Sequence, residues 1–311
     1  MITRFFKISK PFHYILFLSA AIFIFFMQHR NKIWAVNAAE VLKLGITFLC
    51  FLLSIFLVVF IITKNRLTQN NSFAAFYFCL FIFLFPASIN NYEIIISNMF
   101  MLLAFRRIIS MNTKVNLKKK YFDSGLWLCI AVFFYSLSAL YIIPFLATIL
   151  LWRTDRFKHF IVFILGISTV LFINLVLRII FNISAPEIVF KDLKFSFDFL
   201  LFSSLQLKSS FFVFFTLAGC SLTKVINETI LKNNPSRPLF IIILLIFFSS
   251  IVMALISNIY VPQNFLFSFF PISVIAANFA QDQKSNWISN LIIVVIIGLS
   301  LFNISINFLV N

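Results

Sequence analysis

Long apolar runs separated by short polar stretches dominate this chain. The apolar segments fall near 12–27, 43–63, 73–88, 92–109, 125–151, 157–181, 211–227, 238–257, 264–280 and 287–308. A helix needs about 20 apolar residues to cross the hydrocarbon layer of a bilayer. Strands of a membrane barrel would instead alternate apolar and polar residues, and the runs 46–62 and 238–256 do not alternate. The pattern predicts an all-α, polytopic integral membrane protein, with 1–311 forming one transmembrane domain.

The segment 125–151 allows two arrangements. At 1.5 Å per residue it would measure about 40 Å as a single helix, which is too long for one upright crossing. A polar patch, Tyr135–Ser138, lies near its middle, and Pro144 follows closely. Either the segment is one long tilted helix, which gives ten crossings, or it is a hairpin of two short helices that turns near Ser136–Ala139, which gives eleven.

The positions of lysine and arginine favour the hairpin. Loops on the cytoplasmic side of membrane proteins carry an excess of these residues. With a cytoplasmic N-terminus and a hairpin, 18 of the 25 lysines and arginines fall in inside loops, whereas a single helix changes the division to 15 and 10. We therefore expect about eleven transmembrane helices in a bacterial inner membrane, with a cytoplasmic N-terminus, a retained first helix and a periplasmic C-terminus.

Composition supports a membrane protein and narrows its partners. Hydrophobic residues make up 62% of the chain and charged residues 11%, against about 25% charged residues in a typical soluble domain. The net charge of +16 then indicates attraction to anionic lipids at the cytoplasmic face rather than to nucleic acid. We interpret the 47 phenylalanines as apolar side chains that face lipid. The four cysteines and three histidines show no metal-ligand spacing, so we expect neither a metal nor a cofactor.

The longest predicted external loop, 182–210, contains an amphipathic pattern. We interpret it as a short interfacial helix that lies on the membrane surface. Its apolar face would hold Leu193, Phe197, Leu200 and Ser204, and its charged face Lys191, Lys194 and Asp198.

An acid at the predicted external surface is the first candidate for chemistry. Glu93 begins the fourth apolar segment, directly after Asn90, Asn91 and Tyr92. Its carboxylate could act as a general base toward an acceptor hydroxyl, or could coordinate a cation. Alternatively, an acid in the first turn of a helix complements the helix dipole and needs no substrate. Glu40 is a further external acid, at the end of the first external loop, 28–42.

A cation near the outer end of the sixth segment is the second candidate. Arg178 follows Asn174 by one helical turn, so both side chains leave the same face. Arginine can contact a phosphate through two hydrogen bonds, and an anionic lipid phosphate would fit this pair. The alternative is that Arg178 only extends to the headgroup region from a helix end.

The central stretch, about 73–180, resembles the C-type glycosyltransferase superfamily of polyprenyl-phosphate-sugar-dependent membrane enzymes. The likeness rests on the short external loop from Pro86 to Glu93, on the helix that ends in Leu102–Arg107, and on the broken hairpin from Asp123-Ser124-Gly125-Leu126-Trp127 through Tyr141–Pro144 to Leu151-Trp152-Arg153. The resemblance implies sugar transfer at the external face, with a carboxylate from an external loop as base.

The sequence departs from that superfamily in its first external loop. Members place an Asp, or an Asp/Glu pair, directly after the first helix, where this chain has Gln28–Lys32, with Glu40 arriving later. The large external domain of many members is also missing. The opening residues, Met1–Pro11, resemble instead a family of uncharacterised inner-membrane proteins from Bacteroidota, and that likeness extends over the whole chain.

Three hypotheses for function follow. The first is a non-catalytic accessory or scaffold subunit of an envelope complex, which would pack against other membrane proteins. The second is a glycosyltransferase-like enzyme that uses a polyprenyl-phosphate-linked sugar at the external face, with Glu93 as base. The third is a transporter of a lipid-linked substrate. For the last two, we expect substrate contacts from Arg178, Asn174, Asn90, Asn91, Tyr92 and Glu40.

Overall fold

A computed structural model describes residues 2–30, 37–151, 156–181, 205–227, 237–256, 261–281 and 286–310. These ranges are helical and contain no strand, which confirms the all-α prediction. The elements are α1 (Ile2–Phe6), α2 (Pro11–Gln28), α4 (Ala38–Asn65), α5 (Phe73–Leu84), η1 (Pro86–Ile89), α6 (Tyr92–Ile109), η2 (Ser110–Thr113), α7 (Leu117–Phe134), η3 (Ser136–Tyr141), α8 (Ile142–Leu151), α9 (Arg156–Phe181), α10 (Leu205–Val225), α11 (Arg237–Ile256), α12 (Val261–Asn264), α13 (Leu266–Gln281) and α14 (Asn286–Val310).

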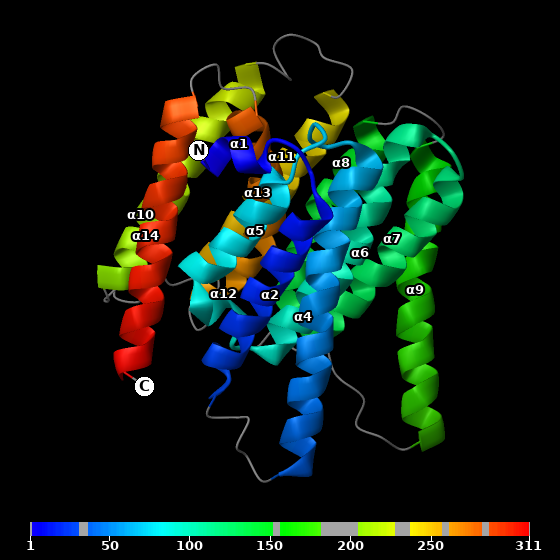
Figure 1. Cartoon of the computed structure of the whole chain (residues 1–311). Helices are drawn as coiled ribbons and strands as arrows, with labels where there is room; N and C mark the ends of the chain where they lie inside the picture. The colour runs from blue at the N-terminus through cyan, green and yellow to red at the C-terminus, as the bar shows by residue number, and fades with distance from the viewer. Residues whose placement is uncertain are drawn as a thin grey trace.

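The helices form a bundle whose two termini lie at opposite ends (Figure 1). At the end that holds the N-terminus, the backbone N–H of Thr3 donates to Oδ1 of Asn290, 3.1 Å away, which joins α1 to α14. At the end that holds the C-terminus, Nδ2 of Asn303 donates to the carbonyl of Leu84 (2.9 Å), which joins α14 to α5. We call these the N-terminal end and the C-terminal end of the bundle.

Positive charge is concentrated at the N-terminal end. The described lysines and arginines in the elements and connections at that end are Lys7, Lys10, Lys64, Arg66, Arg106, Arg107, Lys114, Lys118, Lys119, Lys120, Arg156, Lys158, Lys224 and Arg237. Those toward the C-terminal end are Arg30, Lys43, Arg178 and Lys208. The orientation in the membrane was predicted from the same division of lysines and arginines between the two sides.

Five of the described helices are long and apolar enough to cross a membrane: Pro11–Gln28, Ala38–Asn65, Tyr92–Thr113, Arg156–Phe181 and Arg237–Ile256. Several other apolar helices are shorter, and α5 has only 12 residues. The apolar run 73–88 predicted a longer helix there, but Pro86 starts the 3-10 helix η1 and ends the α-helical geometry. Membrane insertion follows from these helices, while the number of eleven crossings stays a prediction.

The segment 125–151 turns back on itself. α7 ends at Phe134, the six residues of η3 follow, and α8 returns. The hydroxyl of Tyr121, near the start of α7, lies 3.5 Å from the carbonyl oxygen of Thr148, near the end of α8. The polar patch fixes the turn, since Oγ of Ser138 lies 2.7 Å from Oγ of Ser97 in α6. The hairpin alternative is therefore the one found, with its turn at the predicted residues.

The interior is built around α5 and α13, which lie beside each other in the middle of the bundle (Figure 1). Phenylalanines of α5 and α13, and Phe85 directly after α5, pack on one another and on the first half of α10. The ring centroids of Phe81 and Phe269 are 5.8 Å apart, and those of Phe85 and Phe211 are 4.9 Å apart. Many phenylalanines are thus buried in the protein, so the interpretation that they serve to face lipid was wrong for this set.

The helices α7 and α9 cross at very short distance, through two glycines. A Cβ built on Gly125 of α7 would lie 2.3 Å from the carbonyl oxygen of Phe163, and one built on Gly166 of α9 would lie 2.2 Å from that of Phe122. Any larger residue at either position would push the backbones apart. The buried residues of α9, His159, Phe163 and Gly166, all lie in its first half, and large apolar side chains are exposed along the helix from Phe157 to Phe181.

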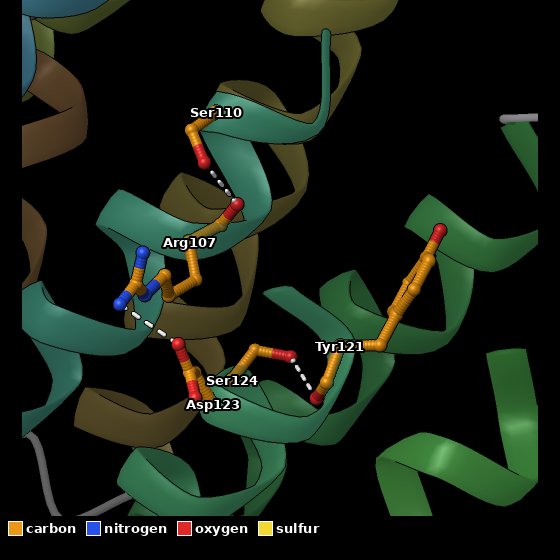
Figure 2. A network of polar contacts seen from close by, with 5 residues as sticks. All are labelled: Arg107, Ser110, Tyr121, Asp123 and Ser124. Atoms are coloured by element: carbon orange, nitrogen blue, oxygen red, sulfur yellow. Dashed lines mark hydrogen bonds and ion pairs between the residues drawn. The ribbon is translucent and has the colours of Figure 1, made fainter. Parts of the chain in front are cut away.

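An ion pair joins α6 to α7 at the N-terminal end of the bundle. Nη2 of Arg107 lies 2.7 Å from Oδ2 of Asp123 (Figure 2). Both side chains are largely shielded, with exposed fractions of 30% and 18%. The neighbouring hydroxyls are occupied within their own helices, Ser110 donating to the carbonyl of Arg107 and Ser124 to that of Tyr121 (Figure 2).

We expect Asp123→Asn to lower the free energy of unfolding by about 1–3 kcal/mol, because it leaves a partly shielded guanidinium without its counter-charge. Thermal unfolding in detergent measures the loss. The double variant Arg107→Gln/Asp123→Asn should recover part of it, since no unpaired charge remains. If the double variant is as unstable as the sum of the two single variants, the pair has no coupling and the expectation is wrong.

The predicted interfacial segment 182–210 lies outside the described residues up to residue 204. Its last six residues form the first turns of α10. The interfacial helix therefore stays a prediction.

Candidate functional site

A polar cavity of about 270 Å³ opens near the C-terminal end of the bundle. Three parts of the chain build it: the end of α2, the first turns of α4, and the connection that leads from η1 into α6. Its lining residues are His29, Glu40, Lys43, Leu44, Thr47, Asn90 and Tyr92. Three of the predicted substrate contacts, Glu40, Asn90 and Tyr92, thus come together from segments 50 residues apart in the sequence. We call this space the α2–α4–α6 cavity.

The inner side of the cavity is formed by two buried polar residues. Thr47 is buried, and its hydroxyl donates to the carbonyl of Lys43, 2.7 Å away. The ring of His29 is also buried and stacks on that of Phe25, with 4.3 Å between the ring centroids. Nδ1 of His29 lies 3.1 Å from the carbonyl oxygen of Phe25, so the ring is held in one orientation.

The outer side carries both signs of charge. The ammonium of Lys43 lies 3.4 Å from the centroid of the Tyr92 ring, a cation–π contact that joins α4 to α6. Glu40 lies one helical turn before Lys43, and both side chains are exposed to solvent at the rim. A carboxylate accepts hydrogen bonds from hydroxyls and an ammonium binds phosphate oxygens, so the two could contact a hydroxyl-rich anion together.

The predicted base Glu93 lies beside this cavity but is not part of its lining. Its Oε1 accepts a hydrogen bond of 2.8 Å from the hydroxyl of Tyr92. Its backbone N–H donates to Oδ1 of Asn91 (2.9 Å), and Asn91 is the N-cap of α6. Asn91 therefore serves the helix start, and Glu93 occupies the first turn, where an acid stabilises the helix dipole.

The second predicted pair lies on another part of the molecule. Nε of Arg178 donates to Oδ1 of Asn174 at 3.1 Å, which agrees with their predicted position on one face of a helix. Both belong to the outer half of α9, and neither lines the α2–α4–α6 cavity. The structure does not bring this pair together with Glu40, Asn90 and Tyr92.

Four lining residues were not predicted from the sequence: His29, Lys43, Leu44 and Thr47. A signal for Lys43, Leu44 and Thr47 was present, since positions 40, 43, 44 and 47 follow the spacing of one helical face. Nothing in the sequence indicated that this face meets Tyr92. Among the residues that the structure describes, no three His, Cys, Asp or Glu side chains gather as metal ligands would.

The chain belongs to the family of unknown function DUF6427, which it matches over residues 1–308. No curated protein and no solved structure matches it. A function must therefore be inferred from the geometry of the cavity and not from a relative.

Proposed function

We propose that this DUF6427 protein is a non-catalytic accessory protein of the bacterial inner membrane that binds the headgroup of a lipid-linked substrate in the α2–α4–α6 cavity. The main support for this binding function is that the Lys43 ammonium is held over the Tyr92 ring in a cavity that Glu40 also lines. Lysine would contact the phosphate, and Glu40 and Asn90 would contact hydroxyls of the attached group. The cavity is small, near the lower limit for ligand pockets, so it fits one sugar ring better than a long glycan.

The position of the cavity supports a lipid-linked ligand. We place the basic N-terminal end in the cytoplasm by the positive-inside rule, which puts the cavity at the external membrane surface. There a lipid tail can stay among the apolar side chains while the headgroup reaches polar residues. The resemblance to the C-type glycosyltransferase superfamily favours a polyprenyl-phosphate-linked sugar, and the resemblance to Bacteroidota proteins favours a bacterial inner membrane.

Binding without reaction fits the geometry better than catalysis. A general base must come within hydrogen-bond reach of the proton that it removes. Glu93 lies outside the cavity, and its carboxylate already accepts from Tyr92. The acid that does line the cavity, Glu40, is exposed at the rim in the first turn of α4. We therefore assign both acids to structure and recognition, and none to proton transfer.

Titration with a polyprenyl-phosphate-linked hexose tests the proposal, with native mass spectrometry of the protein in detergent as readout. Lys43→Gln and Glu40→Gln should each weaken binding about tenfold or more, the effect of losing one charge-assisted hydrogen bond. Lys208→Gln removes an exposed lysine near the same end, outside the cavity lining, and should leave binding unchanged. If Lys208→Gln weakens binding equally, positive surface charge and not the α2–α4–α6 cavity determines binding, and the proposal is wrong.

The same samples separate the proposal from the enzyme hypothesis. No transfer of the hexose to an acceptor or to water should occur with the wild-type protein, and Glu93→Gln should bind as the wild type does. If the wild-type protein transfers the sugar and Glu93→Gln abolishes this transfer, the protein is an enzyme and the proposed non-catalytic role is wrong. Loss of binding in Arg178→Gln but not in Lys43→Gln would move the site to α9.

A further inference from the structure

A second and larger cavity lies near the opposite, N-terminal end of the bundle, and the functions considered so far leave it without a role. It measures about 710 Å³ and lies between the ends of α4, α10 and α13, the starts of α2, α5 and α11, and the connection 66–72. We infer that this cavity binds a phosphate-bearing anion, with Arg66 as its main contact. We call it the Arg66 cavity.

The backbone conformation of Arg66 is the first observation. Arg66 ends α4 in the left-handed region, with φ 50° and ψ 47°. The N–H of Leu67 donates to the carbonyl of Ile62 (3.1 Å), and that of Arg66 to the carbonyl of Thr63 (3.4 Å). This helix ending normally uses glycine at the left-handed position, because a Cβ is strained there. The strain of the left-handed conformation therefore falls on a residue that lines the cavity.

The charge of the lining is the second observation. The described part of the lining contains the cations Arg66 and Lys224 and no acid. Arg66 is exposed, and no ion pair joins its guanidinium to another described residue. The ammonium of Lys224 lies 3.4 Å from the carbonyl oxygen of Phe279, which holds it beside the end of α13. The two cations come from different elements, the end of α4 and the end of α10, and line one cavity.

A rigid amide network is the third observation. Oε1 of Gln281 accepts from the N–H of Gln69 (3.0 Å) and from Nδ2 of Asn71 (2.8 Å). Nδ2 of Asn278 donates to the carbonyl of Leu67, also at 3.0 Å. These bonds fix the connection after Arg66 to α13, so the guanidinium is presented from a backbone held in place. Preorganised donors of this kind lower the cost of binding an anion.

The remaining wall is apolar and indicates the source of the phosphate. Val59, Ile62 and Phe240 line the cavity beside its polar groups. An inorganic phosphate would leave this wall uncovered, whereas a phospholipid could place its headgroup on Arg66 and its first carbons on the wall. Basic pockets between transmembrane helices bind anionic headgroups in this way.

Binding of dioleoyl phosphatidic acid, measured by native mass spectrometry against dioleoyl phosphatidylcholine, tests the inference. Arg66→Gly should weaken phosphatidic acid binding at least tenfold, yet unfold at the same temperature as the wild type or higher, because glycine relieves the left-handed strain. Asparagine also adopts the left-handed conformation readily, so Arg66→Asn should fold normally and lose binding equally. It therefore serves as a second test if Arg66→Gly does not fold. Lys208→Gln, an exposed lysine outside the linings of both cavities, should keep the binding of phosphatidic acid.

Lys114 offers a matched control. It is also an exposed cation in the left-handed region (φ 54°) at the N-terminal end, but it does not line the cavity. Lys114→Gly should therefore keep binding. If it weakens binding as much as Arg66→Gly, or if both Arg66 variants bind as the wild type does, the inference is wrong. Stabilisation of the wild type, but not of Arg66→Gly, by inorganic phosphate alone would support the site and identify a soluble anion as its ligand.

Discussion

Gly125→Ala and Gly166→Ala are each expected to lower the free energy of unfolding by about 1–3 kcal/mol, near the upper limit of that range. The reason is the short crossing of α7 and α9, where the new methyl group would lie 2.3 or 2.2 Å from a backbone oxygen. Backbone atoms cannot rotate away as a side chain can, so the helices must separate. The contact between Tyr121 and His159, whose ring centroids lie 4.7 Å apart at the same crossing, should then loosen as well.

Thermal unfolding in detergent measures this effect, and three other glycines provide the control. Gly45, Gly219 and Gly298 have nothing within 4 Å of a built Cβ. Alanine at these helical positions should be neutral or stabilise by up to about 1 kcal/mol, since alanine favours the helix. An equal loss at Gly45 and at Gly166 would mean that the short crossing of α7 and α9 does not decide the outcome.

A green fluorescent protein fused after Lys158 is expected to fluoresce, because that protein matures only in the cytoplasm. With the hairpin, Lys158 lies at the basic end of the bundle, together with Lys114 and the N-terminus. The orientation of that end follows from the positive-inside rule. Fusions after Lys114 and Lys158 should therefore both fluoresce, while one after Ile256, at the end of α11, should be dark.

The effect is all-or-none for each position, which makes the experiment decisive. A dark fusion at Lys158 with a bright one at Lys114 would require an odd number of crossings between them and would contradict the hairpin in the membrane. Dark fusions at both positions, with fluorescence after Ile256, would invert the orientation. The α2–α4–α6 cavity would then face the cytoplasm, and the proposed external ligand would be wrong.

The helix positions could be predicted closely from the sequence. The apolar runs 92–109 and 157–181 differ from α6 and α9 by at most one residue at either end. They do so because a helix in lipid must be apolar over nearly its whole length, and the first polar residues mark its ends. The choice of the hairpin over a single helix also followed, from the loop charges, because a change in the number of crossings moves every later charge to the other side.

The neighbours of each helix could not be predicted. Apolar residues cover every side of these helices, so hydropathy does not distinguish a face that meets lipid from one that meets protein. The pairing of α5 with α13 and the contact of Lys43 with Tyr92 could therefore not be predicted from the sequence. Glu93 was singled out for its type and place, yet its neighbours Asn91 and Tyr92 show it within a capped helix start.

The central pair α5 and α13 also has a consequence for biosynthesis. α5 ends at Leu84 and α13 begins at Leu266, about 180 residues later. At a synthesis rate of about 5–20 residues per second, α5 leaves the ribosome roughly 10–40 s before its main partner exists. During that time the aromatic face of a helix too short to span the bilayer must be covered by lipid or by earlier helices. The middle of this protein is therefore completed among the last steps of its synthesis, after most of its outer helices are already in the membrane.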